Sequence, residues 1–159
     1  NVYGDAVKEW GVKALERAVE GLKCRTSVHI CYGYGIKANI DWKNSLGPEW
    51  RQYEETFPAL AKSKIDQVSL ECINSRVPLD LLKLLGDKRV ALGAIDVATD
   101  RIEAPEEVAA TLRRALAFVP IERMEASTNC GMAPLDRAVA TAKLAALAAG
   151  AAIINKENK

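Results

Sequence analysis

The hydrophobic and polar positions along the chain follow two different spacings. Helical spacing, with apolar residues every three or four positions, predicts helices over residues 5–22, 54–62 and 105–119, and an Ala-rich helix is predicted from residue 134 onward. Short runs rich in β-branched and other apolar residues predict strands at 26–32, 67–72, 89–96 and 121–129. Pro78 and Gly86 bound a short predicted helix at 79–85. Residues 36–50 show no clear period and are predicted to form a long loop.

The order of these elements predicts the fold class. A first helix is followed by four strand-helix repeats, and no hairpin dipeptide connects two strands. Strands connected in this way run parallel and are joined by right-handed crossovers, so we expect an α/β protein. Because ligands of such sheets bind where the strands end, we expect the chemically active residues at the carboxyl edge.

Charge and cysteine content exclude several classes of function. The 22 Lys and Arg residues are balanced by 21 Asp and Glu residues, which leaves no excess charge for binding nucleic acid or an acidic membrane. The longest apolar run, residues 144–154, is interrupted by Gly150 and is shorter than the roughly 20 residues of a membrane span, so it predicts a packing helix. Four cysteines without a secretory signal pattern favour a cytoplasmic protein whose thiols are free or metal-bound.

The predicted strand ends carry a set of residues that could bind a metal ion. His29 and Cys31 are two positions apart at the end of the first strand, so their side chains should point to the same face. Glu71 lies at the end of the second strand and Cys130 follows the fourth. One imidazole, two thiolates and one carboxylate form a ligand set that suits zinc, and the sulfur ligands argue against magnesium or calcium.

Each of these residues also has an ordinary structural interpretation. The His-x-Cys spacing alone is weak evidence, since a histidine within a strand is often hydrogen-bonded in the core and free cysteines are frequently buried. Glu71 could pair with a Lys or Arg side chain. Cys24, which precedes the first strand, and Cys72, which should face away from Glu71, are predicted to pack in the core.

Several polar and aromatic residues elsewhere also have both a functional and a structural interpretation. Asp96, at the end of the third strand, could be an active-site carboxylate or a loop cap beside Thr99. Asp41, Trp42 and Trp50 in the predicted loop could line a pocket, although loop aromatics more often pack against the body of a protein.

Four segments, in the correct order, resemble the motifs of the catalytic barrel of cobalamin-independent methionine synthase. The resemblance implies that zinc is held by His29, Cys31, Glu71 and Cys130, and that this zinc binds the thiol of homocysteine for methyl transfer to give methionine. Zinc would supply the thiolate, because a free thiol is mostly protonated at neutral pH. The segments are His29-Ile30-Cys31-Tyr32-Gly33, Ser69-Leu70-Glu71-Cys72, Gly93-Ala94-Ile95-Asp96-Val97 and Ser127-Thr128-Asn129-Cys130-Gly131.

The resemblance also implies a larger structure than this chain provides. The family has an eight-stranded (β/α)8 TIM barrel, whereas this sequence predicts four strands and resembles its second half. We therefore expect residues 1–159 to form a single domain or fragment, the C-terminal half of a zinc methyltransferase barrel. The missing N-terminal half would come from a longer polypeptide or from a partner.

The methyl donor is left open by one local difference. Ala98 stands where long, folate-using members place a histidine, two residues after the aspartate that corresponds to Asp96. That histidine is thought to help protonate the departing pterin, whereas a methylated corrinoid would need no such acid. The donor is thus a methyltetrahydrofolate or a methylated corrinoid, and Asp96 is the candidate for a polar or proton-handling role.

Two other functions compete with methyl transfer. The four ligands could form a closed structural zinc site in a non-catalytic α/β interaction domain, which would have no exchangeable position for a substrate. A decarboxylase of the wider barrel superfamily is less well supported, because it would give the two thiols no task.

Overall fold

Four parallel strands form a sheet in the order β1-β2-β3-β4 in the computed structural model, which describes residues 6–34, 37–73 and 75–159. The strands are β1 (Ser27–Ile30), β2 (Gln67–Glu71), β3 (Arg89–Ile95) and β4 (Met124–Thr128). Each strand pairs in parallel with the next one along the chain. The predicted α/β class with parallel strand-helix repeats is confirmed.

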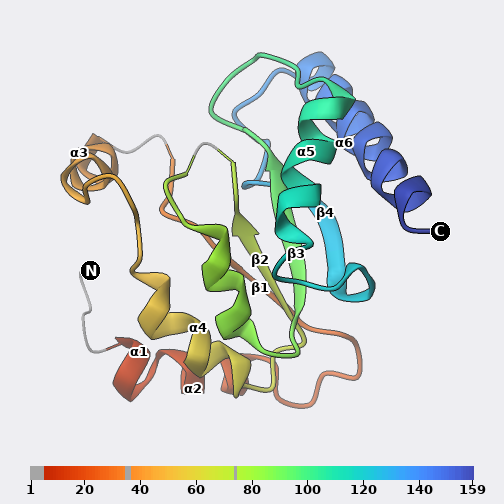
Figure 1. Cartoon of the computed structure of the whole chain (residues 1–159). Coiled ribbons are helices and arrows are strands. Elements are labelled where there is room, and N and C mark those ends of the chain that lie inside the picture. The colour runs from red at the N-terminus through yellow and green to blue at the C-terminus, as the bar shows by residue number, and fades with distance from the viewer. Residues whose placement is uncertain (1–5, 35–36, 74) are drawn as a thin grey trace.

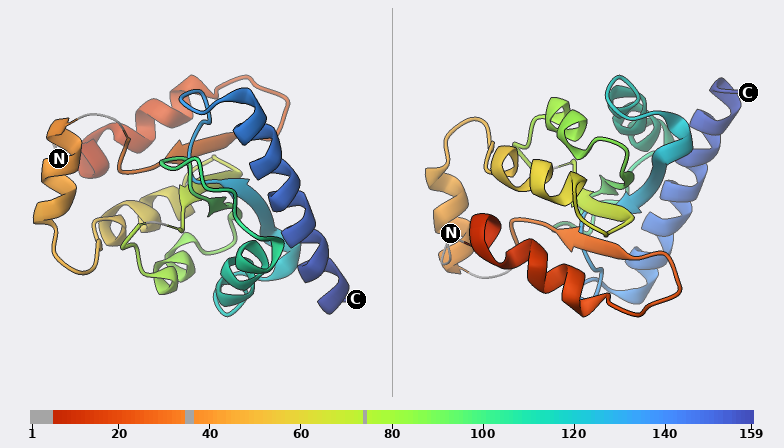
Figure 2. Two further views of the ribbon diagram at one scale, coloured as in Figure 1. Left: turned by 90° about the horizontal axis from the view of Figure 1, so that it is seen from above. Right: turned by 90° about the horizontal axis from the view of Figure 1, so that it is seen from below.

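Helices surround this sheet on its outer side (Figure 1). Viewed from above and below, α2, α4, η1, α5 and α6 follow one another in an arc around the strands (Figure 2). Among the described residues, no helix of this arc covers the inner face of the sheet. The helices are α1 (Ala6–Glu9), α2 (Gly11–Ala18), α3 (Lys37–Ser45), α4 (Tyr53–Ala61), the 3-10 helix η1 (Leu79–Leu85), α5 (Pro105–Ala115), the 3-10 helix η2 (Ile121–Arg123) and α6 (Arg137–Glu157).

The two faces of the sheet differ in polarity. Residues that are in register on neighbouring parallel strands point to the same face, so alternate rows are buried against the helices. The outer rows contain fully buried Val68, Leu70, Val90 and Leu92. The inner rows are polar in part, and one of them runs across all four strands: His29, Ser69, Ala91 and Glu125.

The sheet is strongly curved, which brings its two outer strands together. In a flat sheet β1 and β4 would be three strand spacings apart, or about 14 Å. Instead, the Sγ atoms of Cys31, just after β1, and Cys130, just after β4, are 3.9 Å apart. At the amino end, Arg25 Nη1 lies 3.8 Å from Glu125 Oε1. Side chains of the outer strands therefore meet across the concave inner face at both ends.

The predicted loop over residues 36–50 is wrong for most of its length, because Lys37–Ser45 forms α3; residue 36 lies outside the described residues. Tertiary contacts stabilise this helix where sequence periodicity does not. The Trp42 ring stacks on Tyr32, with ring centroids 5.5 Å apart, and the Lys43 ammonium donates to the Gly33 carbonyl at 2.7 Å. A Lys37–Asp41 ion pair spans one turn.

Several other predicted boundaries differ from the structure. The strand predicted at 26–32 covers only Ser27–Ile30, and the helix predicted at 105–119 ends at Ala115. The helix predicted at 5–22 is divided at Trp10 into α1 and α2 and ends at Ala18; residue 5 lies outside the described residues. The strand predicted at 121–129 is shorter, since its first three residues form η2. The last helix begins after Asp136 rather than at Pro134, because the Asp136 carboxylate accepts the Ala138 N–H at 2.8 Å and caps the first turn.

Helix α6 is 21 residues long and, by length and composition alone, apolar enough to cross a membrane. It instead packs along α5 and against β3 and β4. Gly150 allows the close approach: a Cβ built on it would lie 2.6 Å from the Val108 side chain and 2.8 Å from the Pro105 carbonyl oxygen. The prediction of a packing helix agrees with these contacts.

A side chain at Gly150 should separate the two helices. We expect Gly150→Val to lower the free energy of unfolding by about 1–3 kcal/mol, the usual cost of overpacking. Ala149→Val is the matched control, since Ala149 is exposed on the same helix and should cost less than about 1 kcal/mol. Urea unfolding of the two variants measures the difference, and equal effects would contradict this account of the α5–α6 contact.

Candidate metal centre

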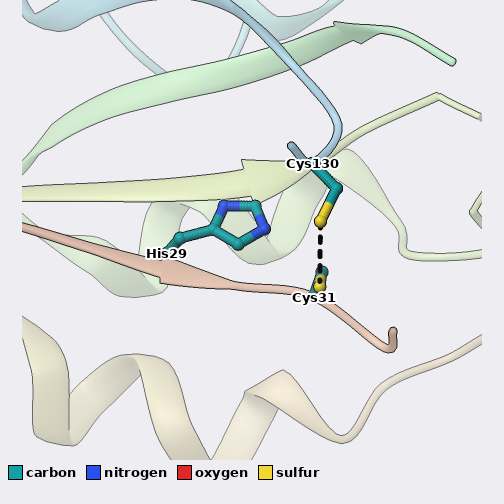
Figure 3. A group of neighbouring side chains, drawn as sticks. All are labelled: His29, Cys31 and Cys130. Atoms are coloured by element: carbon teal, nitrogen blue, oxygen red, sulfur yellow. Dashed lines mark hydrogen bonds between the residues drawn. The ribbon is translucent and has the colours of Figure 1, made fainter. Parts of the chain in front are cut away.

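Three potential metal ligands meet at the carboxyl edge of the sheet. His29 lies in β1, Cys31 follows β1, and Cys130 follows β4. A nitrogen of His29 and the two Sγ atoms all lie within 4.8 Å of one another, and the two sulfurs are 3.9 Å apart (Figure 3). The structure thus brings together three of the four residues that the sequence offers as metal ligands.

The geometry of this group fits a tetrahedral metal ion with sulfur ligands. Two thiolates bound to one zinc ion at about 2.3 Å lie about 3.8 Å apart. The Cys31–Cys130 separation of 3.9 Å matches this value without any rearrangement of the backbone. Both cysteines are half-buried, whereas His29 is exposed, so the group is open on the histidine side.

A hydroxyl group orients the imidazole of His29. Its Nδ1 atom is 3.0 Å from Ser69 Oγ, on the neighbouring strand in the same register. A hydrogen bond at Nδ1 leaves Nε2 as the nitrogen available to a metal, and such outer contacts are the usual way in which histidine ligands are held. Ser69 thus has a supporting role that its position in the sequence did not reveal.

Glu71 is not a member of the three-residue group. Its side chain is almost fully buried, and its carboxylate accepts the Tyr32 N–H at 2.7 Å and the Tyr34 hydroxyl at 2.7 Å. Burial, followed by the hydrogen bond to Glu71, raises the pKa of Tyr34, which therefore remains a donor. The alternative pairing of Glu71 with Lys or Arg is not found, because its described partners are these two tyrosines.

Asn129 connects the ends of β2 and β4. It is fully buried, and its Oδ1 accepts the N–H groups of Cys72 at 3.2 Å and Ile73 at 3.4 Å. Its Nδ2 donates to the Ile73 carbonyl and to the Tyr34 hydroxyl. Because Cys130 is the next residue, these bonds also set the position of one candidate metal ligand. Asn129 lies within one of the four sequence motifs, but nothing in its local sequence predicts this role.

The environment of Cys31 disfavours its thiolate when no metal is bound. Burial raises the pKa of the Cys31 thiol to about 11, with smaller contributions from Cys130 and Glu71. A positive ion between the sulfurs would offset this cost, because it favours the ionised form of a ligating thiol. The local electrostatics thus suit a metal site better than a pair of free thiolates.

The remaining two cysteines were predicted to pack in the core. Cys72 does so: it is 7% exposed, and burial raises its pKa to about 12. The prediction for Cys24 is wrong, because its side chain is exposed in the turn before β1. None of the four cysteines forms a disulfide in the structure.

Asp96 lies directly after β3, at the same edge of the sheet, but outside the metal group. It is half-buried, and its Oδ1 accepts the Ala98 N–H at 2.8 Å, which is the local capping arrangement rather than a bond to Thr99. The following residues of its loop border a cavity of about 560 Å³. The lining consists of Tyr34, Ile40, Lys43, Val97, Ala98, Thr99, Asp100, Pro134 and Leu135.

The aromatic residues predicted to lie in a loop mostly pack inward. Trp50 is 6% exposed and contacts the Tyr32 ring at 4.9 Å between centroids, and Trp42 stacks on the same ring. Asp41 is exposed and pairs with Lys37. Trp50 also borders a second cavity beside Lys43 and Arg76, so packing and pocket lining are combined in this one residue.

The fold and the site together define a parallel β/α protein with a candidate thiolate-rich metal centre at the carboxyl edge of its sheet. A family described as "Cobalamin-independent synthase, Catalytic domain" matches residues 48–152. The chain belongs to this cobalamin-independent methionine synthase family and lies in its catalytic domain. The resemblance seen in the four sequence motifs is confirmed.

Relatives and a solved structure agree with this assignment. A methionine synthase of Saccharolobus islandicus is 34% identical over 152 residues, covering 94% of this chain and 40% of the relative. One from Thermococcus kodakarensis is 32% identical over 148 residues, covering 92% and 38%. A B12-independent methionine synthase from Shewanella sp. W3-18-1, solved in complex with selenomethionine, superposes with a TM-score of 0.92 at 63% identity, covering 98% of this chain and 46% of that chain. The chain thus spans about 40% of the length of these curated relatives.

The contact between Gly93 and Asn129 should be sensitive to any side chain. A Cβ on Gly93 would lie 2.7 Å from Asn129 Oδ1, 2.7 Å from the Leu70 carbonyl oxygen and 2.8 Å from Asn129 Cα. We expect Gly93→Ala to cost about 1–3 kcal/mol of unfolding free energy and to reduce metal binding, because backbone atoms must move beside Cys130.

Gly131→Ala is the control for this prediction, since nothing lies within 4 Å of the Cβ it would add. It should change stability by less than about 0.5 kcal/mol. Urea unfolding and metal titration of both variants test the difference. If Gly93→Ala binds metal and unfolds like the control, the close approach does not support the site.

Proposed function

We propose that this chain forms the zinc-binding half of the catalytic domain of a homocysteine S-methyltransferase. The observation that carries the proposal is the 3.9 Å separation of the Cys31 and Cys130 sulfurs beside His29, in a chain of this family. Zinc, when bound, would supply the positive charge that keeps the homocysteine sulfur as a thiolate at neutral pH. The product would be methionine.

In this proposal the described side chains hold and orient the reacting groups. His29, Cys31 and Cys130 hold the ion, and the exposed histidine side leaves space for the thiol of homocysteine. Glu71 is the fourth proposed ligand. Its two bonds from Tyr32 and Tyr34 hold it beside the group, and each carboxylate oxygen retains a lone pair for the metal.

The transferred methyl group comes from an activated donor. A lone pair of the homocysteine sulfur forms the new S–C bond, while the electron pair of the bond between the methyl group and the donor leaves with the donor. We propose a methyltetrahydrofolate or a methylated corrinoid as that donor. Asp96 is the proposed proton-handling or polar residue, since its carboxylate lies at the same edge as the ligands and next to a cavity-lining loop.

The rest of the barrel is proposed to come from sequence outside this chain. Among the described residues, β1 and β4 each pair on only one side, and the polar inner face is uncovered. Open edges of this kind are normally paired or covered in a native protein. Four further strand-helix units would close the sheet and add the remaining groups that hold the amino acid and the donor.

An open, three-residue group with an exposed histidine favours a catalytic site over a closed structural one. A structural zinc site has no position for an added ligand. X-ray absorption at the zinc edge, recorded on the full-length zinc-loaded polypeptide, should therefore change when homocysteine is added. An unchanged spectrum at saturating homocysteine would favour the alternative, a non-catalytic interaction domain with a structural zinc site.

Removing one sulfur should abolish zinc binding and turnover together. We expect Cys130→Ser in the full-length polypeptide to weaken zinc binding and to lower methionine formation by at least about 100-fold. Loss of a side chain that only hydrogen-bonds to a metal ligand already lowers metal affinity or activity by about 10–100-fold. Cys24→Ser is the matched control: its thiol is exposed before β1, and it should keep both properties.

Zinc content by mass spectrometry and methionine formation, with each candidate donor supplied in turn, are the measurements. Wild-type protein purified without chelator should contain about one zinc per chain. Clearly less than one zinc in the wild type, or full zinc and activity in Cys130→Ser, would contradict the proposal.

The role of Asp96 is tested separately. In Asp96→Asn the amide oxygen can still accept the Ala98 N–H, so the loop should keep its shape while the charge is lost. We expect kcat to fall by about 100-fold, within the range for loss of an acid or base group, at unchanged zinc content. Activity within about threefold of wild type would remove Asp96 from the reaction.

A further inference from the structure

A buried ion pair lies beneath the loop that follows β3. Lys143 in α6 and Glu103 have side chains that are 0% and 1% exposed, and Lys143 Nζ lies 3.0 Å and 3.2 Å from the two Glu103 oxygens. Lys143 also donates to the Arg101 carbonyl. Burying two charges gives little net stability, because desolvation opposes their attraction. Stability alone therefore does not explain why this pair is buried here.

Glu103 has a second partner in the candidate site. Its Oε1 accepts the backbone N–H of Asp96 at 2.9 Å. The side chain of Asp96 in turn accepts the Ala98 N–H at 2.8 Å. Hydrogen bonds thus link Lys143 through Glu103 to the backbone N–H of Asp96. The carboxylate of Asp96 then accepts the Ala98 N–H.

Helix α6 also packs through small and apolar residues. Ala146, Gly150 and Ile154 are buried along the same helix, and Gly150 contacts the Val108 side chain directly. Figure 1 shows the first turns of α6 close to the loop between β3 and α5. Two apolar side chains could fill the volume of the pair, but they could not accept the Asp96 N–H or donate to the Arg101 carbonyl.

We propose that Glu103 is a positioning residue that acts through Asp96, and that Lys143 holds Glu103 in place. The inference rests on the proposed function, in which Asp96 takes part in methyl transfer. Glu103 fixes the backbone of Asp96 where β3 ends, and this fixes the direction of the carboxylate toward the carboxyl edge. Helix α6, which contributes no metal ligand, is linked by this path to the reacting groups.

Two double variants of the full-length zinc-loaded polypeptide separate positioning from packing. Lys143→Met/Glu103→Gln removes both charges and keeps an oxygen that can accept the Asp96 N–H. Lys143→Met/Glu103→Leu removes both charges and this acceptor. Both variants avoid an unpaired buried charge, so a difference between them reports the bond to Asp96.

We expect the Gln-containing variant to keep kcat within about threefold of wild type and the Leu-containing variant to lose about 10–100-fold in kcat, with the KM for homocysteine and the zinc content unchanged in both. When Asp96→Asn is added to both double variants, their kcat values should differ by less than about twofold, because Glu103 acts through Asp96. Equal kcat values for the two double variants, or fully additive effects in the Asp96→Asn background, would overturn the proposal.

A measurement on the wild type keeps the proposal testable if the Leu-containing variant does not fold. The Asp96 amide should exchange with solvent as slowly as the amides of β3, because it is bonded to a buried carboxylate. Exchange as fast as that of the exposed residues of the loop would overturn it. This exchange rate requires no activity, so a wild type that fails to transfer methyl groups would refute the proposed function while the position of Asp96 is still measured.

Discussion

The curvature of the sheet is the constraint on which the candidate site depends. β1 and β4 are the outer strands of a four-stranded sheet and would be about 14 Å apart if it were flat. Their following residues nevertheless bring two sulfurs to 3.9 Å. The candidate metal ligands therefore come from opposite margins of the sheet, and a flatter sheet would separate them.

Small and buried residues near the carboxyl edge maintain this arrangement. Gly93 leaves the space that Asn129 occupies, and Asn129 ties the end of β4 to the end of β2 through the backbone of Cys72 and Ile73. The same asparagine reaches the Tyr34 hydroxyl, which donates to Glu71. One buried amide therefore links the positions of Cys130, which follows β4, and Glu71, at the end of β2.

The two faces of the sheet differ in polarity, and the candidate metal ligand His29 lies on the polar one. The outer face of the sheet is apolar and covered by helices, whereas the inner face carries His29, Ser69 and Glu125 without a helical cover. A polar interior and two open strand edges are costly features for an isolated domain. The curated relatives of the family are longer, and this chain spans about 40% of their length.

Much of this organisation could be predicted from the sequence. The alternation of apolar runs with helical periodicity identified the parallel α/β class, because both depend on local spacing. His29 and Cys31 were predicted to face the same way for the same reason, and four short motifs in order were specific enough to indicate the family. Local spacing gave wrong predictions at two places. It did not predict helix α3, which the stacking of Trp42 on Tyr32 stabilises, and it did not predict the exposure of Cys24, which depends on the path of a turn.

Contacts between distant segments required the tertiary structure. Which candidate ligand types stand at the strand ends, and on which face, followed from local sequence, since side-chain direction alternates along a strand. That Cys31 meets Cys130, and that two tyrosines hold Glu71, followed from the folded arrangement alone. The same is true of Lys143, which reaches Asp96 through Glu103, because these distances depend on sheet curvature and on packing between residues some 40 to 100 positions apart.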